Sequence, residues 1–149
     1  MIYYDIIKIL DDQLSLDDFV NTVIRGDIYD IDLNKQTIFP LSHIMVNSVA
    51  KENNILRVNI TIMCMDIVDI NKAETTDILR QNDNEDDVLN TQLAVALRAM
   101  EVFQRGDNTK SWFLDGNPTF EPFTERFENY LAGWACTFDL LVPNDMTKC

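Results

Sequence analysis

The sequence is poor in the residues that build most catalytic and metal sites. Its 149 residues include one histidine, three cysteines and four glycines. The spacing of the histidine and cysteines matches no zinc-ligand pattern, and so few glycines provide no phosphate-binding loop. An odd number of cysteines also argues against a disulfide framework. Cys64 and Cys136 are in phase with the predicted buried faces of their segments, while Cys149 is expected to be a free thiol.

Basic residues are scarce as well. Twelve lysines and arginines stand against 25 acidic residues, which gives a formal net charge of -13. A surface this negative repels phosphate backbones and anionic lipids, so we expect no direct binding of nucleic acid or membrane. Two interpretations of the acidic excess remain open. It serves solubility alone, or it forms a surface past which nucleic acid slides without sticking.

Long hydrophobic runs are absent too. None approaches the roughly 20 apolar residues that span a bilayer. The first residues do not resemble a secretory leader, so we expect synthesis in a cytoplasm. A length of 149 residues, 46% of them hydrophobic, suits one domain over residues 1–149.

Hydrophobic periodicity predicts two helices. The first runs from Ile2 to about Leu16. The second, from Val88 to Arg105, is the clearest element, and Gly106 follows it as a suitable end. The predicted apolar stripe of the second helix comprises Leu89, Leu93, Ala96, Leu97, Met100 and Phe103. The acidic segment before it, about 71–87, is expected to be a mobile loop or a solvated face, and its last carboxylates suit a helix start.

Alternating hydrophobicity predicts a long β-hairpin, with strands at Leu41–Val49 and Ile55–Ile70. Apolar residues occupy both faces from Met63 onward, which predicts that this end of the second strand is covered on both sides. A third long strand is expected at Phe127–Val142. Residues 15–25 fit either a short strand or a helical turn, and turns are expected to dominate residues 107–122.

The predicted fold class is therefore α+β. The sheet is expected to be mainly antiparallel, built from the long hairpin and the C-terminal strand. The long helix and the N-terminal helix are expected to pack on one of its faces.

No catalytic, cofactor-binding or metal-ligating residue is predicted. His43 has no nucleophile near it in a recognisable motif, and a hydrogen-bonded or interface histidine is the favoured interpretation. Asp30, Asp32 and Asn34 resemble the opening of a calcium loop, but Lys35 stands where that loop needs glycine. Adjacent pairs such as Asp11 and Asp12 project apart. We therefore expect a protein that is not an enzyme.

Aromatic residues in the predicted turn region suggest an interface instead. Aromatic side chains often anchor protein contacts. The alternative interpretation is that they fill the end of the core. The candidate interface residues are Phe113, Phe120, Pro122, Phe123 and Phe127.

Several stretches of the sequence resemble small tail-completion proteins of tailed bacteriophages. The resemblance spans about residues 27–143 and includes proteins of phages of the Bacteroidetes, among them crAss-like phages. It is carried by the stretches Asp32–Val46, Ile55–Asp66, Leu89–Arg105, Pro122–Phe127 and Ala132–Trp134.

The resemblance implies a fold like that of tail terminators and head–tail joining (neck) proteins, in which a β-sheet is flanked by helices. It implies subunits that close into a ring of six or twelve copies and contact neighbouring neck or tail proteins in the virion. It carries no active site, and DNA would pass the lumen without specific binding. The sequence also leaves open a cytoplasmic protein-binding adaptor and, less well supported, an enzyme that uses scattered carboxylates.

Overall fold

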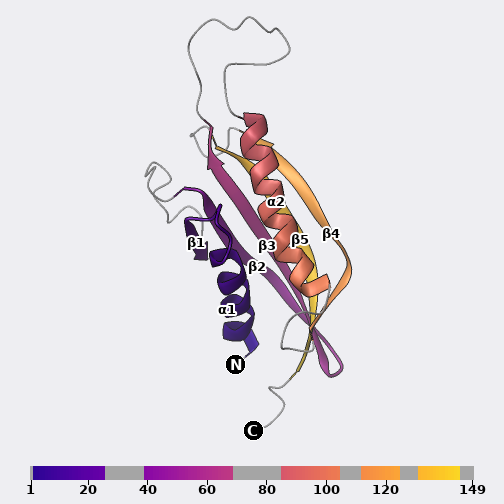
Figure 1. Ribbon diagram of the computed structural model, residues 1–149. Coiled ribbons are helices and arrows are strands. Elements are labelled where there is room, and N and C mark those ends of the chain that lie inside the picture. The colour runs from indigo at the N-terminus through magenta and orange to yellow at the C-terminus, as the bar shows by residue number, and fades with distance from the viewer. Residues whose placement is uncertain (1, 26–38, 69–84, 105–111, 125–130, 145–149) are drawn as a thin grey trace, which may run out of the picture.

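The computed structural model describes residues 2–25, 39–68, 85–104, 112–124 and 131–144. These residues form two helices and a five-stranded sheet (Figure 1), so the predicted α+β class is confirmed. The helices are α1 (Ile2–Ser15) and α2 (Glu85–Gln104). The strands are β1 (Thr22–Arg25), β2 (Leu41–Glu52), β3 (Ile55–Ile67), β4 (Phe113–Thr124) and β5 (Leu131–Pro143).

The sheet is mixed, with the strand order β1-β2-β3-β5-β4. The pairs β2–β3, β3–β5 and β4–β5 are antiparallel, whereas β1 runs parallel to β2. The hairpin and the returning C-terminal strand were predicted. The parallel strand was not, because four residues at an edge carry no local signal of strand direction. The ambiguous segment 15–25 thus ends in a strand.

The predicted hairpin is confirmed, with a longer first strand than expected and a second strand that ends at Ile67 and not at Ile70. Strand β2 continues to Glu52, three residues beyond Val49, and the turn consists of Asn53 and Asn54. Asn53 has a φ of 54°, a conformation that asparagine tolerates better than most residues. The register shifts between Val46 and Ser48, which marks a bulge at Asn47. In Figure 1 the turn projects beyond the lower end of α2.

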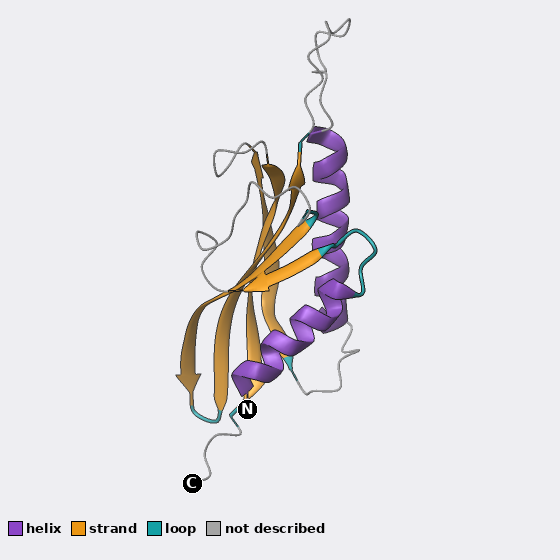
Figure 2. Cartoon of the chain, turned by 90° about the vertical axis from the view of Figure 1, so that its left-hand side faces the viewer, coloured by secondary structure: helices purple, strands orange, loops and turns teal. Residues whose placement is uncertain are grey.

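Both helices lie on the same face of the sheet, as Figure 2 shows. Helix α1 packs on β1 and β2, and α2 packs on β3, β5 and β4. The core between the layers includes Leu10 and Leu14 of α1, Ile60 and Ile62 of β3, and Met100 of α2. The packing of both helices on one face of the sheet agrees with the sequence prediction.

The apolar stripe of α2 differs from the predicted one. Val95 and Ala99 are buried, at 1% and 5% exposure, whereas Leu97 is 45% exposed. The helix is thus rotated so that alanines approach the sheet and the bulkier Leu97 faces outward. The indole N–H of Trp134 on β5 donates a hydrogen bond to the carbonyl of Leu89, 2.8 Å away, which fixes one side of the helix against the sheet.

The expectation that turns dominate residues 107–122 was wrong for residues 113–122. They belong to β4, an outer strand paired with β5. The turn-forming residues 115–118 are accommodated by a register shift between Asp115 and Thr119, where Gly116 has a φ of 74°. An edge strand tolerates Pro118 and Pro122 because only one of its sides is hydrogen-bonded. Residues 107–111 lie outside the described part of the chain.

A second, smaller core lies on the opposite face of the sheet. Met63 and Met65 are buried there, while Ile62 and Cys64 are buried on the helix side. Strand β3 is therefore covered on both faces near this end, as its sequence predicted. The buried members of this second core are Phe39, Leu41, Met63, Met65, Phe123 and Leu131. Of the acidic segment 71–87, residues 85–87 begin α2 and residues 71–84 lie outside the described part.

Gly133 is expected to be essential for the pairing of β3 with β5. A methyl group at Gly133 would lie 2.8 Å from Cα of Met65 and would also collide with the carbonyl oxygen of Cys64. Backbone atoms in a central strand cannot move aside cheaply. Gly133→Ala should therefore lower the free energy of unfolding by at least about 2 kcal/mol, measured by urea denaturation.

Gly116→Ala is the matched control for that variant. No atom lies within 4 Å of a Cβ built at Gly116, so only its positive φ opposes the substitution. The expected cost is about 1 kcal/mol. Equal costs for the two glycines would contradict the close packing inferred at Gly133.

Candidate functional site

Four of the five candidate interface residues lie on β4, but they do not form one cluster. Phe113 is 63% exposed and pairs with Leu141, on the face that the helices leave uncovered. Phe120 pairs with Cys136 on the helix-covered face, where it packs against the main core. Pro122 is exposed, whereas Phe123 is only 6% exposed and belongs to the second core. Phe127 lies outside the described residues.

Strand β4 is poorly suited to pairing with another strand through its free edge. Pro118 and Pro122 have no N–H to donate, and Asp115 and Glu121 place exposed charges along the strand. Prolines, charges and a register shift are the devices that keep edge strands from pairing. Any contact made by this edge would therefore depend on side chains such as Phe113.

A chain of hydrogen bonds crosses the uncovered face of the sheet. Asn47 on β2 donates to Asn59 and Thr61 on β3, each at 2.8 Å. Asn59 donates to Asp139 on β5 at 2.7 Å, and the hydroxyls of Thr61 and Thr137 are 3.1 Å apart. These contacts link β2, β3 and β5. The donor on β2, Asn47, is the bulged residue, so the bulge orients its side chain towards β3.

Arg57 links all four antiparallel strands on this face, at the end of the sheet where the β2–β3 turn lies (the distal end). Its guanidinium group contacts Glu52 at 2.8 Å, Asp139 at 3.7 Å and also Asp115. The hydrogen bond from Arg57 and the attraction of its charge lower the pKa of Glu52 below its usual value. Three carboxylates around one cation leave this region acidic.

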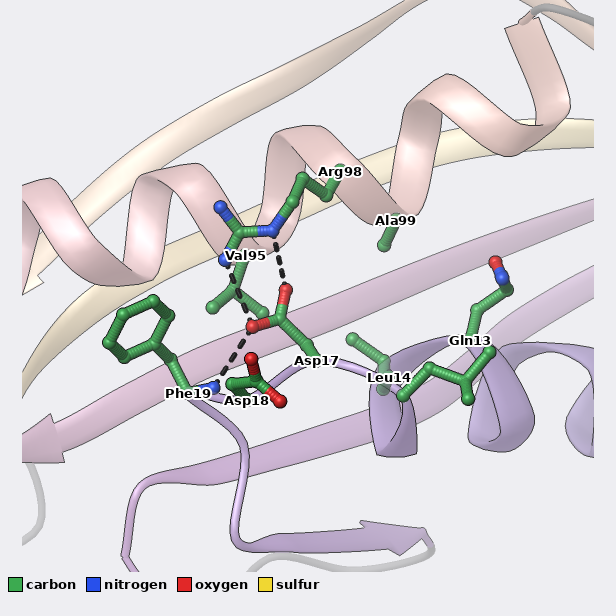
Figure 3. Close-up of a pocket in the computed structure, with 9 residues that line it drawn as sticks. Gln13, Leu14, Asp17, Asp18, Phe19, Val95, Arg98 and Ala99 are labelled. Carbon is green, nitrogen blue, oxygen red and sulfur yellow. Dashed lines mark hydrogen bonds and ion pairs between the residues drawn. The ribbon is translucent and has the colours of Figure 1, made fainter.

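A cleft of about 450 Å³ lies between the end of α1, the segment that follows it and the middle of α2. An ion pair crosses it, as Figure 3 shows. Arg98 Nε is 2.6 Å from Asp17 Oδ2, and Arg98 Nη2 is 2.9 Å from Asp17 Oδ1. The backbone N–H of Phe19 also donates to Asp17 Oδ1, at 3.0 Å. The Arg98 guanidinium carbon lies 5.9 Å from the centre of the Phe19 ring.

Asp17 connects the segment after α1 to α2 and is held in its charged form. The Asp17 side chain is 9% exposed and accepts three hydrogen bonds, so its oxygens are occupied. Partial burial, the largest single influence, acts to raise the pKa of Asp17. The hydrogen bonds from Arg98 and Phe19 and the guanidinium charge outweigh burial and hold that pKa below its usual 3.8. Apolar side chains form much of the remaining lining, namely Leu14, Leu16, Phe19, Val95 and Ala99.

A second cleft of about 430 Å³ lies where α1 meets β1 and β2. Its polar rim includes Lys8, Asp11, Asp12 and Arg25. Lys8 pairs with Asp12 at 2.8 Å, and Ser15 donates to Asp11 at 3.0 Å. Asp11 and Asp12 thus have different partners, and the two carboxylates are not paired with each other.

The residues that were weighed for catalysis do not converge. His43 is 1% exposed, on the face of β2 opposite the helices. Burial raises the pKa of Cys64 and of Cys136 to about 12, so neither thiol is activated as a nucleophile. Within the described residues, no group of three or more histidine, cysteine, aspartate or glutamate side chains could hold a metal ion. Asp30, Asp32 and Asn34 lie outside those residues.

Sequence reasoning missed the Asp17–Arg98 pair. The two residues are 81 positions apart, and neither belongs to a motif. Asp17 follows the end of α1 and Arg98 lies in the middle of α2, so only the packing of the two helices on one sheet face brings them together. Arg98 lies within the predicted second helix, but the sequence does not indicate its partner.

Comparison of the sequence with protein-family models and with curated proteins finds no match to either. Among the described residues, no helix is long and apolar enough to cross a membrane.

The Asp17–Arg98 pair makes stability depend on pH. Because the folded-state pKa of Asp17 is lowered, its contribution is present above the unfolded-state value near 3.8 and is lost as the pH falls through the folded-state pKa. Asp17→Asn should cost about 1 kcal/mol at neutral pH, since Arg98 is half exposed and can be rehydrated. Urea denaturation at several pH values should show this cost shrinking below pH 3.8.

Asp18→Asn is the control for that experiment. Asp18 is exposed and makes no ion pair with another described residue. Its replacement should change stability little at any pH. A cost for Asp17→Asn that persists unchanged in acid would show that the charge on Asp17 is not the source of the stabilisation.

Proposed function

We propose that the chain is a ring-forming structural subunit of the neck or tail end of a tailed bacteriophage and that it has no enzymatic activity. The observation that carries this proposal is that two groups of exposed large apolar side chains lie on separate parts of the surface, in addition to the exposed Tyr3, Tyr4, Met45 and Leu97. One group lies at the distal end of the sheet, and the other lies at the cleft between the helices.

The distal group surrounds the hairpin turn and the start of β4. Phe113 is 63% exposed, Val49 54% and Ile55 44%. On the uncovered face, Ile55 pairs with Pro143 and Phe113 pairs with Leu141, two residues earlier on β5. Val49 lies on the other face of the same hairpin, since it pairs with the core residue Val58.

The second group lies in the segment that follows α1. Leu16 is 76% exposed and Phe19 is 54% exposed, at the lip of the cleft that contains Asp17 and Arg98. Large apolar side chains that are exposed close together favour a contact with another protein. Two unlike patches on one subunit favour head-to-tail contacts, which close into a ring when the rotation between copies allows it.

Two further features support a virion ring. The sheet with helices on one face agrees in outline with the fold that the resemblance to tail-completion proteins implies. The net charge of -13 suits a lumen through which DNA passes, because carboxylates repel the phosphate backbone. The contacts with neighbouring neck or tail proteins would then use the surfaces that remain outside the ring.

Native mass spectrometry across a range of protein concentrations tests the proposal. We expect a species of six or twelve subunits that grows with concentration at the expense of the monomer. A dimer that persists across the range would instead support the adaptor alternative and contradict the ring.

Direct DNA binding provides an independent test of the acidic lumen. Fluorescence anisotropy with a labelled duplex should show no binding at low salt, about 50 mM, where electrostatic attraction would be strongest. Tight, salt-sensitive binding to the duplex would contradict a lumen that repels DNA.

A further inference from the structure

The lip of the cleft presents a charge between two exposed apolar side chains. Leu16 and Phe19 are 76% and 54% exposed, and the exposed Asp18 lies between them in the sequence. Asp18 makes no ion pair within the described part of the chain. Its neighbour Asp17 forms the close ion pair with Arg98, which attracts Asp18 only at longer range, so Asp18 is the carboxylate of the cleft without an ion pair to a described residue.

The hairpin tip presents the opposite charge in a similar setting. Val49 and Ile55 are 54% and 44% exposed, and Lys51 is exposed between them. Lys51 has no ion-pair partner among the described residues, because the nearby Glu52 is engaged by Arg57. Arg57 is offset by Glu52, Asp115 and Asp139, so the positive charge that the tip can offer to a partner is that of Lys51.

We propose that the hairpin tip of one copy docks in the cleft of the next copy, with Lys51 facing Asp18 and with Val49, which lies on the same face of the hairpin as Lys51, against Leu16 and Phe19. This contact would join the two surfaces that a ring requires, so the inference rests on the proposed function. It joins unlike patches, so it is head-to-tail and leaves a free tip and a free cleft at the ends of any open chain of subunits.

Charge complementarity selects this occupant of the cleft. The lining carries Asp17 and Asp18 against Arg98, a net charge of one negative, and Lys51 at the tip is an exposed cation with no ion pair to a described residue. Contact between two acidic surfaces of these chains would be repulsive, whereas the tip brings a cation. An isolated metal ion is a poor occupant, since the oxygens of Asp17 are occupied and Asp18 alone offers one carboxylate.

Contacts within the subunit support both surfaces before they meet. The N–H of Phe19 is bound by Asp17, and Arg98 lies over the Phe19 ring, which together hold the lip in place. The tip is braced by the bonds of Arg57 to Glu52 and Asp115 and by those of Asn47 to Asn59 and Thr61. Side chains that are ordered in the free subunit lose little entropy on binding.

A charge-exchange experiment on the full chain tests the contact. Lys51→Glu and Asp18→Lys should each raise the concentration needed for half-assembly at least about tenfold, because each places like charges together. The double variant restores an opposite pair and should return assembly to near the wild-type concentration. Glu121→Lys, an exposed site on β4 with the same change of charge as Asp18→Lys, is the control and should leave assembly largely unchanged.

The readout is native mass spectrometry, with circular dichroism to show that each variant is folded. Loss of the high-mass species in both single variants and its return in the double variant would support the contact. If the wild type assembles and the single variants assemble equally well, or the double variant fails to recover, the contact is wrong and the ring stands. A wild type that stays monomeric at every concentration would overturn both the contact and the proposed ring.

Discussion

The pairing of β3 with β2 on one side and β5 on the other is the interaction on which the rest of the structure depends. The helix-facing residues of β3, such as Ile60 and Ile62, form the surface on which both helices pack. Its opposite face carries the Asn59 and Thr61 contacts and Arg57. Because one strand supplies both faces, its register fixes the core and the outer surface at once, and Gly133 permits the close approach of β5.

The sequence revealed those elements whose periodicity is strong and local. The alternation in Ile55–Ile67 and the apolar stripe of α2 predicted a strand and a helix, and the structure confirms both. Strand β4 was missed because the turn-forming residues 115–118 usually indicate a loop. In an edge strand they can be accommodated by a bulge. The exposed position of Leu97 could not be foreseen either, since the rotation of α2 is set by contacts such as that of Trp134.

The candidate site was the least predictable part of the molecule. Aromatic residues near the end of the chain drew attention to Phe113, which is exposed, but also to Phe123, which is buried. The cleft depends on Asp17 and Arg98, whose contact spans 81 positions and has no sequence signature. The role of a charged surface residue can be inferred only when tertiary packing shows whether it is already paired. Asp17 is paired with Arg98, whereas the adjacent Asp18 has no ion pair with a described residue.

The central claim is that copies of this chain close into a ring through unlike surfaces. Electron microscopy of the highest-mass species, averaged in views along its symmetry axis, tests this claim most directly. The account predicts a closed ring of six or twelve copies around an open centre. A compact two-fold particle, or filaments that never close, would contradict it.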